Sequence, residues 1–183
     1  MDLTHIAFIH ANSVPGWDYT VREDGELENL PNMLRFKREF TDAPFDDFSR
    51  WLHPDIEAPV NNAVVSEFLS PALINAGGPY ISKPELPEQV RKMNFVHAVT
   101  PETPHSTHYF MATARNFRLE DDALSQQLSE SMVRVAYEDV TSLEAIEPFV
   151  DEFGDARKEV SLRSDAAGIR VRRLISAQAR HPE

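Results

Sequence analysis

Residues 122–150 are the part of this sequence that most restricts the fold. Apolar side chains recur there every three or four residues, a spacing that places them on one face of an α-helix. They are Leu128, Met132, Val135, Leu143, Ile146 and Val150. The pattern predicts one long helix whose apolar stripe is buried against another layer of the protein.

An acidic residue interrupts this stripe. Asp139 lies four residues after Val135 and four before Leu143, so the helix would carry its carboxylate toward the core. A buried carboxylate needs a compensating group, because an unpaired charge is costly away from water. An Arg or Lys, a set of backbone N–H groups or a metal ion would compensate it. Alternatively, the edge of the stripe reaches water at Asp139.

Several segments before this helix have the features of β-strands, with apolar side chains bounded by Gly, Pro or Asp. They are residues 17–23, 33–40, 60–69, 71–76, 91–99 and 106–115. Strands followed by helices predict an α+β domain in which an antiparallel sheet packs against the long helix.

The remaining segments are predicted from local signals. Residues 2–10 and 45–53 should form short helices, and Ser164-Asp165 should cap a final helix that runs to about Gln178. Three prolines in residues 77–88 predict a surface loop, and the TPETP segment at 100–104 predicts a hairpin turn. His53, His105 and His181 are interpreted as surface residues, and Trp17 and Trp51 as packing residues.

Two histidines flank the apolar run IAFI near the N-terminus. His5 and His10 are five residues apart, which is about 140° around an ideal helix. A helix that ends between them could direct both at one metal, although histidines at this spacing are also common as ordinary surface or core residues. Two histidines and a distant carboxylate such as Asp139 make up the facial triad of non-haem Fe(II) oxygenases, which leaves half of the coordination sphere open for O₂ and substrate.

Three segments resemble a known family. DLTHIAFIH (2–10) resembles the D-x2-H-x4-H iron motif of Rieske-type aromatic oxygenase α subunits. HAVTPETPHSTHYFMATARNF (97–117) is similar to the vanillate and dicamba O-demethylase branch of that family. YEDVTSLEAIE (137–147) is similar to the segment in which that branch carries its carboxylate ligand. The motifs follow the family's order and cover nearly the whole chain.

The resemblance implies a fold, an activity and roles for particular residues. The fold would be the helix-grip or START-like catalytic domain, and the activity an O₂-dependent hydroxylation or O-demethylation of a small aromatic compound by a monooxygenase. His5, His10 and Asp139 would bind one mononuclear Fe(II). Asp2 would be the catalytic aspartate that links His5 to a Rieske-cluster histidine of a neighbouring subunit, although it could also be a helix N-cap or first-turn acid.

Two further positions correspond to substrate-facing residues of the dicamba-demethylating members. They are Asn75 and His97. Read without the resemblance, Asn75 is equally a turn asparagine and His97 a core histidine whose hydrogen bonds are satisfied.

Cysteine is absent from the sequence, which excludes disulfides, a cysteine nucleophile and any iron–sulfur cluster held by this chain. The family's α subunit normally begins with a Rieske domain that carries a 2Fe–2S cluster. We therefore expect residues 1–183 to be the mononuclear-iron catalytic domain as a fragment, without the Rieske domain and the first strands of the sheet. Electrons would come from NADH through a reductase and a Rieske or ferredoxin partner. The family's trimer is not expected for this chain alone.

Charge and hydropathy exclude other classes of partner. The net charge of −12 disfavours nucleic acid, because a negative surface repels phosphate. No stretch approaches the roughly 18 apolar residues of a membrane span, and the N-terminus lacks the features of a secretory signal. The sequence therefore predicts a cytoplasmic protein. The alternative functions are a non-catalytic module that binds a small apolar ligand and an inactive truncated remnant.

Overall fold

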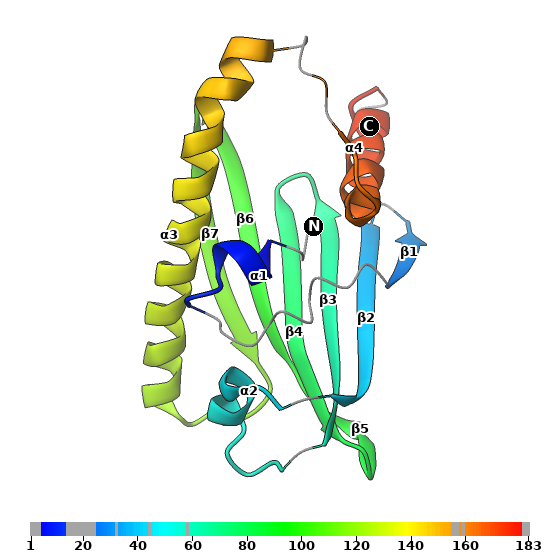
Figure 1. Ribbon diagram of the computed structural model, residues 1–183, viewed down its shortest axis with the longest axis vertical. Helices are drawn as coiled ribbons and strands as arrows, with labels where there is room; N and C mark the ends of the chain where they lie inside the picture. Colours follow the sequence, from blue (N-terminus) through cyan, green and yellow to red (C-terminus); the bar gives the residue numbers. More distant parts are fainter. Residues whose placement is uncertain are drawn as a thin grey trace.

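The computed structural model describes residues 5–13, 25–31, 33–43, 45–57, 59–154, 158 and 160–180. They form an antiparallel sheet with a long helix along one side, which is the predicted α+β class (Figure 1). The sheet has the order β1-β2-β3-β4-β6-β7, with β5 paired to β4. Its strands are β1 (Glu26–Leu30), β2 (Met33–Ala43), β3 (Val60–Ser70), β4 (Leu73–Lys83), β5 (Leu86–Arg91), β6 (Met93–Thr103) and β7 (Ser106–Arg115).

The helices lie around this sheet. Figure 1 shows the long helix beside β6 and β7, a short helix across the middle of the sheet, and the last helix beside β2. They are α1 (Ile6–Ile9), α2 (Asp47–Leu52), α3 (Asp122–Phe153) and α4 (Ala166–Arg180), the last preceded by the 3₁₀ turn η3 (Arg163–Asp165). None of the helices in the described ranges is both long and apolar enough to span a membrane.

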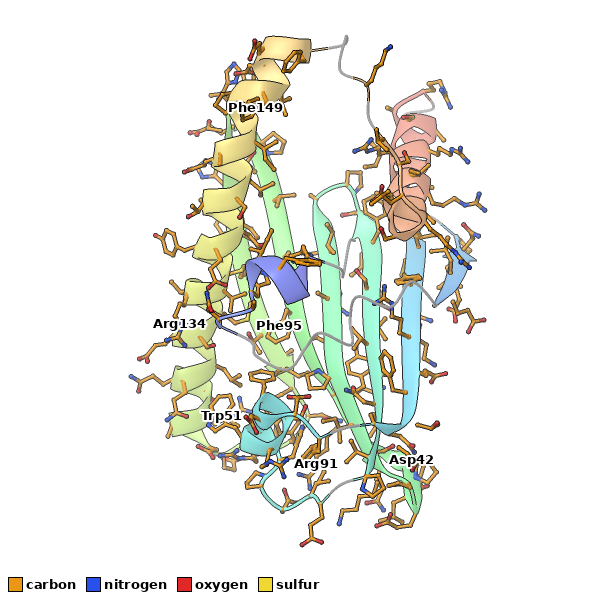
Figure 2. All side chains as sticks on the ribbon, viewed as in Figure 1. Asp42, Trp51, Arg91, Phe95, Arg134 and Phe149 are labelled. Atoms are coloured by element: carbon orange, nitrogen blue, oxygen red, sulfur yellow. The ribbon has the colours of Figure 1, made fainter. Side chains whose placement is uncertain are left out.

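The N-terminal half of α3 is anchored on the sheet. Leu124 and Leu128 pack in one buried cluster with Met93 of β6, Leu52 and Phe117. Phe95, which is labelled in Figure 2, packs against this cluster. Side chains alternate between the two faces of a strand, so Met93 and Phe95 define the face of the sheet that α3 covers. We call it the helical face.

Five of the predicted strands are confirmed at 33–40, 60–69, 71–76, 91–99 and 106–115, each of which begins within two residues of an observed strand, although β2, β4 and β6 continue beyond the predicted ends. The predicted strand at 17–23, together with Trp17 and His181, lies outside the described residues. Strand β1 was not predicted, because its sequence ELENL is short and largely polar.

The predicted surface loop at 77–88 is wrong. Strand β4 continues to Lys83, and β5 follows it. The register with β3 shifts between Ala63 and Val65, and Gly78 and Pro79 lie in this irregularity. A proline is tolerated at such a bulge because the sheet needs no hydrogen bond from its backbone nitrogen there. Gly78 adopts a φ of 141°, a conformation that favours glycine. Similarly, β6 runs through most of the TPETP segment to Thr103.

The predicted apolar stripe of α3 is buried only in part. Leu128 is buried, but Leu143 is 65% exposed and Ile146 is 52% exposed. A helix of 32 residues is about 48 Å long, and its second half packs against no buried cluster of the described residues. In Figure 2, Phe149 lies in this upper part of α3. The stripe therefore leaves apolar surface exposed beyond Asp139.

The interpretation of His53 as a surface residue is also wrong. Its side chain is fully buried, and its ring packs against Phe117 with a centroid distance of 4.3 Å. Neither ring nitrogen has a hydrogen-bond partner in the described part of the chain. Burial, and secondarily the positive charge of Arg91, lower the pKa of His53 to about 4.

We predict that His53 makes folding stability depend on pH. The pKa of His53 is lower in the folded protein than in the unfolded chain, so on acidification the unfolded chain binds a proton first. The free energy of unfolding therefore falls as the pH drops from about 6.5 toward 4. Between pH 7.5 and pH 5, wild type should lose about 2 kcal/mol more unfolding free energy than His53→Leu, measured by urea denaturation. His105→Leu, at an exposed histidine, should behave as wild type. An identical pH dependence in wild type and His53→Leu would contradict the prediction.

Candidate metal centre

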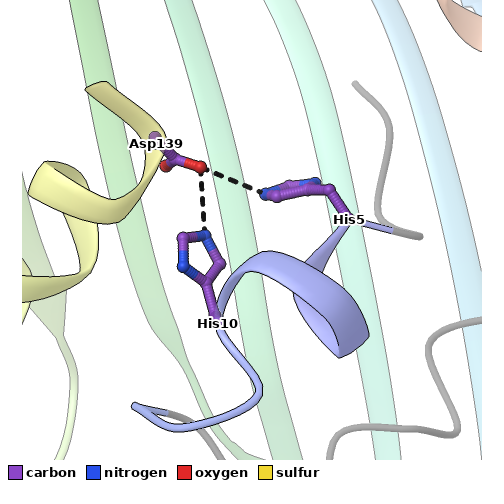
Figure 3. A group of neighbouring side chains, drawn as sticks. All are labelled: His5, His10 and Asp139. Atoms are coloured by element: carbon purple, nitrogen blue, oxygen red, sulfur yellow. Dashed lines mark ion pairs between the residues drawn. The ribbon is translucent and has the colours of Figure 1, made fainter. Parts of the chain in front are cut away.

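Helices α1 and α3 bring three of the predicted site residues together (Figure 3). Asp139 Oδ1 lies 3.2 Å from His10 Nε2 and 3.8 Å from His5 Nε2. The two imidazole rings meet edge to face at a centroid distance of 5.1 Å. One possible ligand atom from each of the three residues lies within 4.8 Å of the other two.

The shortness of α1 explains how both histidines reach one point. The backbone N–H groups of Phe8 and Ile9 donate to the carbonyl of His5, and the helix ends at Ile9. His5 therefore precedes a single helical turn and His10 follows it, so the angular separation of a longer helix does not apply. His10 is 3% exposed, while His5 and Asp139 are half-buried.

Glu138 is a fourth ionisable residue in this group, and sequence reasoning missed it. Its Oε2 lies 2.8 Å from His10 Nδ1, and its Oε1 accepts a 2.5 Å hydrogen bond from the Ser13 hydroxyl. The available signal was the Glu-Asp pair at 138–139, because consecutive helix residues point about 100° apart and can approach one ring from two sides.

The carboxylates control the electrostatics of this group. Burial would lower the pKa of His10, but Asp139 and Glu138 hold it above its ordinary value. Burial would raise the pKa of Asp139, but the hydrogen bond from His10 and the charges of the neighbouring histidines hold it below its ordinary value. The Ser13 hydroxyl, followed by His10, lowers the pKa of Glu138. Both carboxylates are thus ionised at neutral pH, and the group favours a positive charge.

The donor set fits a divalent metal. In the described part of the chain, the ion pairs of Asp139 are those with His5 and His10, and no Arg or Lys compensates its charge. Ligands bound to one ion at about 2.0–2.2 Å can be at most about 4.4 Å apart, and the distances from Asp139 Oδ1 to the two histidine nitrogens are shorter than this. Two imidazoles and one carboxylate suit Fe(II) in particular.

A second group of possible ligands lies at the tip of the β6–β7 hairpin. His105 Nδ1 is 3.5 Å from Glu147 Oε1 and 3.7 Å from Asp151 Oδ2 of α3. All three side chains are exposed, at 66%, 48% and 54% respectively. These distances and exposures are ordinary for surface ion pairs, which contribute little free energy.

His97 lies on the helical face, as the alternation from Met93 and Phe95 requires. Its Nδ1 is 2.5 Å from the Tyr109 hydroxyl, and the two rings are nearly parallel. Burial lowers the pKa of His97, although the charge of Asp139 acts in the opposite direction. Burial, followed by the charge of Asp139, raises the pKa of Tyr109 to about 12. His97 therefore lies within electrostatic range of Asp139 and the candidate metal centre, and Tyr109 is a partner that sequence reasoning did not identify.

The structure does not bring Asn75 together with His97. The cross-strand partner of Asn75 is Val96, the residue next to His97, so the two side chains point to opposite faces of the sheet. Asn75 Nδ2 donates to Glu67 at 2.7 Å and to Asn94 at 3.1 Å. Asp2, the remaining predicted residue, lies outside the described residues.

Comparisons with known proteins agree on one family. The family model described as the vanillate O-demethylase oxygenase C-terminal domain matches residues 1–181. The oxygenase component of chloroacetanilide N-alkylformylase from Rhizorhabdus wittichii is 30% identical over 97% of this chain and 51% of its own length. A vanillate O-demethylase oxygenase subunit from a Pseudomonas species is 28% identical over 96% of this chain and 55% of its own length. The chain thus spans about half the length of these relatives.

The fold has a solved counterpart. A crystal structure of dicamba monooxygenase bound to 3,6-dichlorosalicylic acid superposes on all of this chain and on 54% of its own chain, with a TM-score of 0.79 and 19% identity. Another structure of that enzyme, with non-haem iron and dicamba, gives a TM-score of 0.66 at 16% identity over 98% of this chain and 55% of its own. At these identities the likeness establishes the fold.

Proposed function

The chain belongs to the family of vanillate O-demethylase oxygenase C-terminal domains, and we propose that it is the mononuclear-iron catalytic domain of a Rieske-type monooxygenase. The observation that carries this proposal is the convergence of His5, His10 and Asp139 at the contact between α1 and α3. The names of the relatives as oxygenase components support the same reaction class.

Three residues would hold the metal. His5 Nε2, His10 Nε2 and Asp139 Oδ1 would be its ligands, and the Asp139 carboxylate would offset one of its two positive charges. Bound there, Fe(II) would supply the activation of O₂ that a monooxygenase needs to hydroxylate a C–H bond. The protein would position the substrate and exclude water from the site.

The surroundings of the ligands suit a small aromatic substrate with a polar group. Leu143 follows Asp139 by one helical turn and exposes apolar surface, as does Ile146 further along α3. His97 and Tyr109 provide a hydrogen-bonding pair on the helical face. We therefore assign the substrate-facing role to His97 and not to Asn75, whose side chain points to the other face.

The electrons would come from outside these 183 residues. A Rieske 2Fe–2S cluster needs two cysteines, and the sequence has none. We propose that a Rieske cluster, reduced by NADH through a reductase, donates to this domain, with Asp2 at the crossing between the two centres. A cytoplasmic location follows from this dependence on NADH. For an aryl methyl ether, hydroxylation of the methyl group gives a hemiacetal that collapses to a phenol and formaldehyde.

We predict that the metal-free protein binds one equivalent of Fe(II) under anaerobic conditions. Asp139→Asn should lose this binding because the amide contributes no charge, yet it should remain folded, which circular dichroism and thermal melting can check. Asp151→Asn, at the exposed hairpin group, is the matched control and should bind iron as wild type does. Loss of binding in Asp151→Asn but not in Asp139→Asn would overturn the assignment of the site.

We also predict under which conditions the iron-loaded chain converts substrate to product. With NADH and a reductase alone it should form no product, because no cluster relays the electrons. Hydrogen peroxide supplies both oxygen and electrons, and should allow slow release of formaldehyde from an aryl methyl ether, measured colorimetrically, in wild type but not in Asp139→Asn. Product from NADH and reductase alone would contradict the proposed electron supply. Binding of iron and ether without product from peroxide would contradict the oxygenase proposal and favour a ligand-binding module.

A further inference from the structure

The imidazole of His10 lies between two carboxylates from consecutive residues of α3. Asp139 faces Nε2 at 3.2 Å, and Glu138 faces Nδ1 at 2.8 Å. His10 is the most buried member of the proposed ligand set, so its ring orientation is fixed by these contacts and not by water. Each ring nitrogen therefore has a different partner, and only the nitrogen on the Asp139 side can share a cation with that residue.

This arrangement determines which nitrogen is available to a metal. A neutral imidazole carries one N–H, and the other nitrogen offers a lone pair. An ionised carboxylate can only accept a hydrogen bond, so Glu138 holds a proton of His10 on Nδ1. A cation that takes the place of the proton between Nε2 and Asp139 then meets the lone pair of Nε2. A carboxylate that accepts from the non-ligating nitrogen also makes the imidazole a stronger donor to the metal.

Glu138 is itself held in place by Ser13. The Ser13 hydroxyl donates to Oε1 at 2.5 Å, and the Ser13 backbone N–H donates to the carbonyl of His10 at 3.0 Å. These bonds close a loop from His10 through the turn at residues 11–13 to Glu138 and back to the His10 ring. The loop joins the segment after α1 to the middle of α3, so the orientation of the glutamate is set before any metal arrives.

We infer that Glu138 is a positioning residue for the metal centre, which binds no metal itself but holds His10 in the orientation and tautomer that present Nε2 to the cation. The inference rests on the proposed function, because it assumes that His10 and Asp139 share a metal. Ser13 assists by orienting Glu138.

Co(II) titration of the metal-free protein, followed by its visible absorption, tests this inference. Glu138→Ala should weaken Co(II) binding by about 10- to 100-fold, the usual effect of removing such a partner. Glu138→Gln should lose less, because its amide oxygen can still accept from Nδ1–H. Ser13→Ala should lose less than Glu138→Ala. Glu144→Gln changes an exposed glutamate of the same helix and should match wild type.

Proton NMR of the Co(II)-loaded proteins separates positioning from a purely structural role. The Nδ1 proton of His10 should give a shifted signal that exchanges slowly with water in wild type and Glu138→Gln. In Glu138→Ala it should exchange rapidly, while circular dichroism shows α3 intact. Unchanged affinity and unchanged exchange in Glu138→Ala would overturn the inference and leave the metal site standing. Failure of wild type itself to bind Co(II) would instead overturn the proposed function.

Discussion

The contact of the His10 ring with Glu138 and Asp139 is the interaction on which the rest of the site depends. In the sequence, Glu138 and Asp139 follow His10 by 128 and 129 positions. The contact therefore determines where α1 lies on α3. Leu124 and Leu128 pack α3 against Met93 of β6, and this packing places residues 138 and 139 of the same helix where they meet His10. Hydrophobic packing thus positions the helix, and the charged pair then positions the histidines.

This order of causes accounts for the electrostatic character of the site. Two ionised carboxylates on consecutive residues repel each other, and partial burial strengthens that repulsion. In the described part of the chain only histidines, with Ser13, face them, so a cation between His10 and Asp139 would relieve it. In the exposed group, the distances from His105 to Glu147 and Asp151 are similar, but water screens the charges of the two carboxylates. Burial, and not the spacing of the donors, distinguishes the two groups.

The sequence was sufficient for the features that local pattern determines. The spacing of apolar residues around Asp139 predicted α3, and the order of the motifs selected His5 and His10. Features that depend on a partner strand could not be predicted from the sequence. For example, β4 continues through Gly78 and Pro79 because the register with β3 shifts opposite them. The same holds for the burial of His53 against Phe117 and for the exposure of Leu143. Asn75 shows the limit most clearly, because one position in the β4–β6 register decides which face it occupies.

The position of a bound metal tests the central claim most directly. Crystals of the anaerobically Fe(II)-loaded protein, measured on both sides of the iron absorption edge, locate iron without reference to any assumed ligand. The account predicts one anomalous peak at the α1–α3 contact, bonded to His5 Nε2, His10 Nε2 and an Asp139 oxygen at about 2.0–2.2 Å. A peak at His105, Glu147 and Asp151 instead, or iron bonded to Glu138 in place of Asp139, would contradict it.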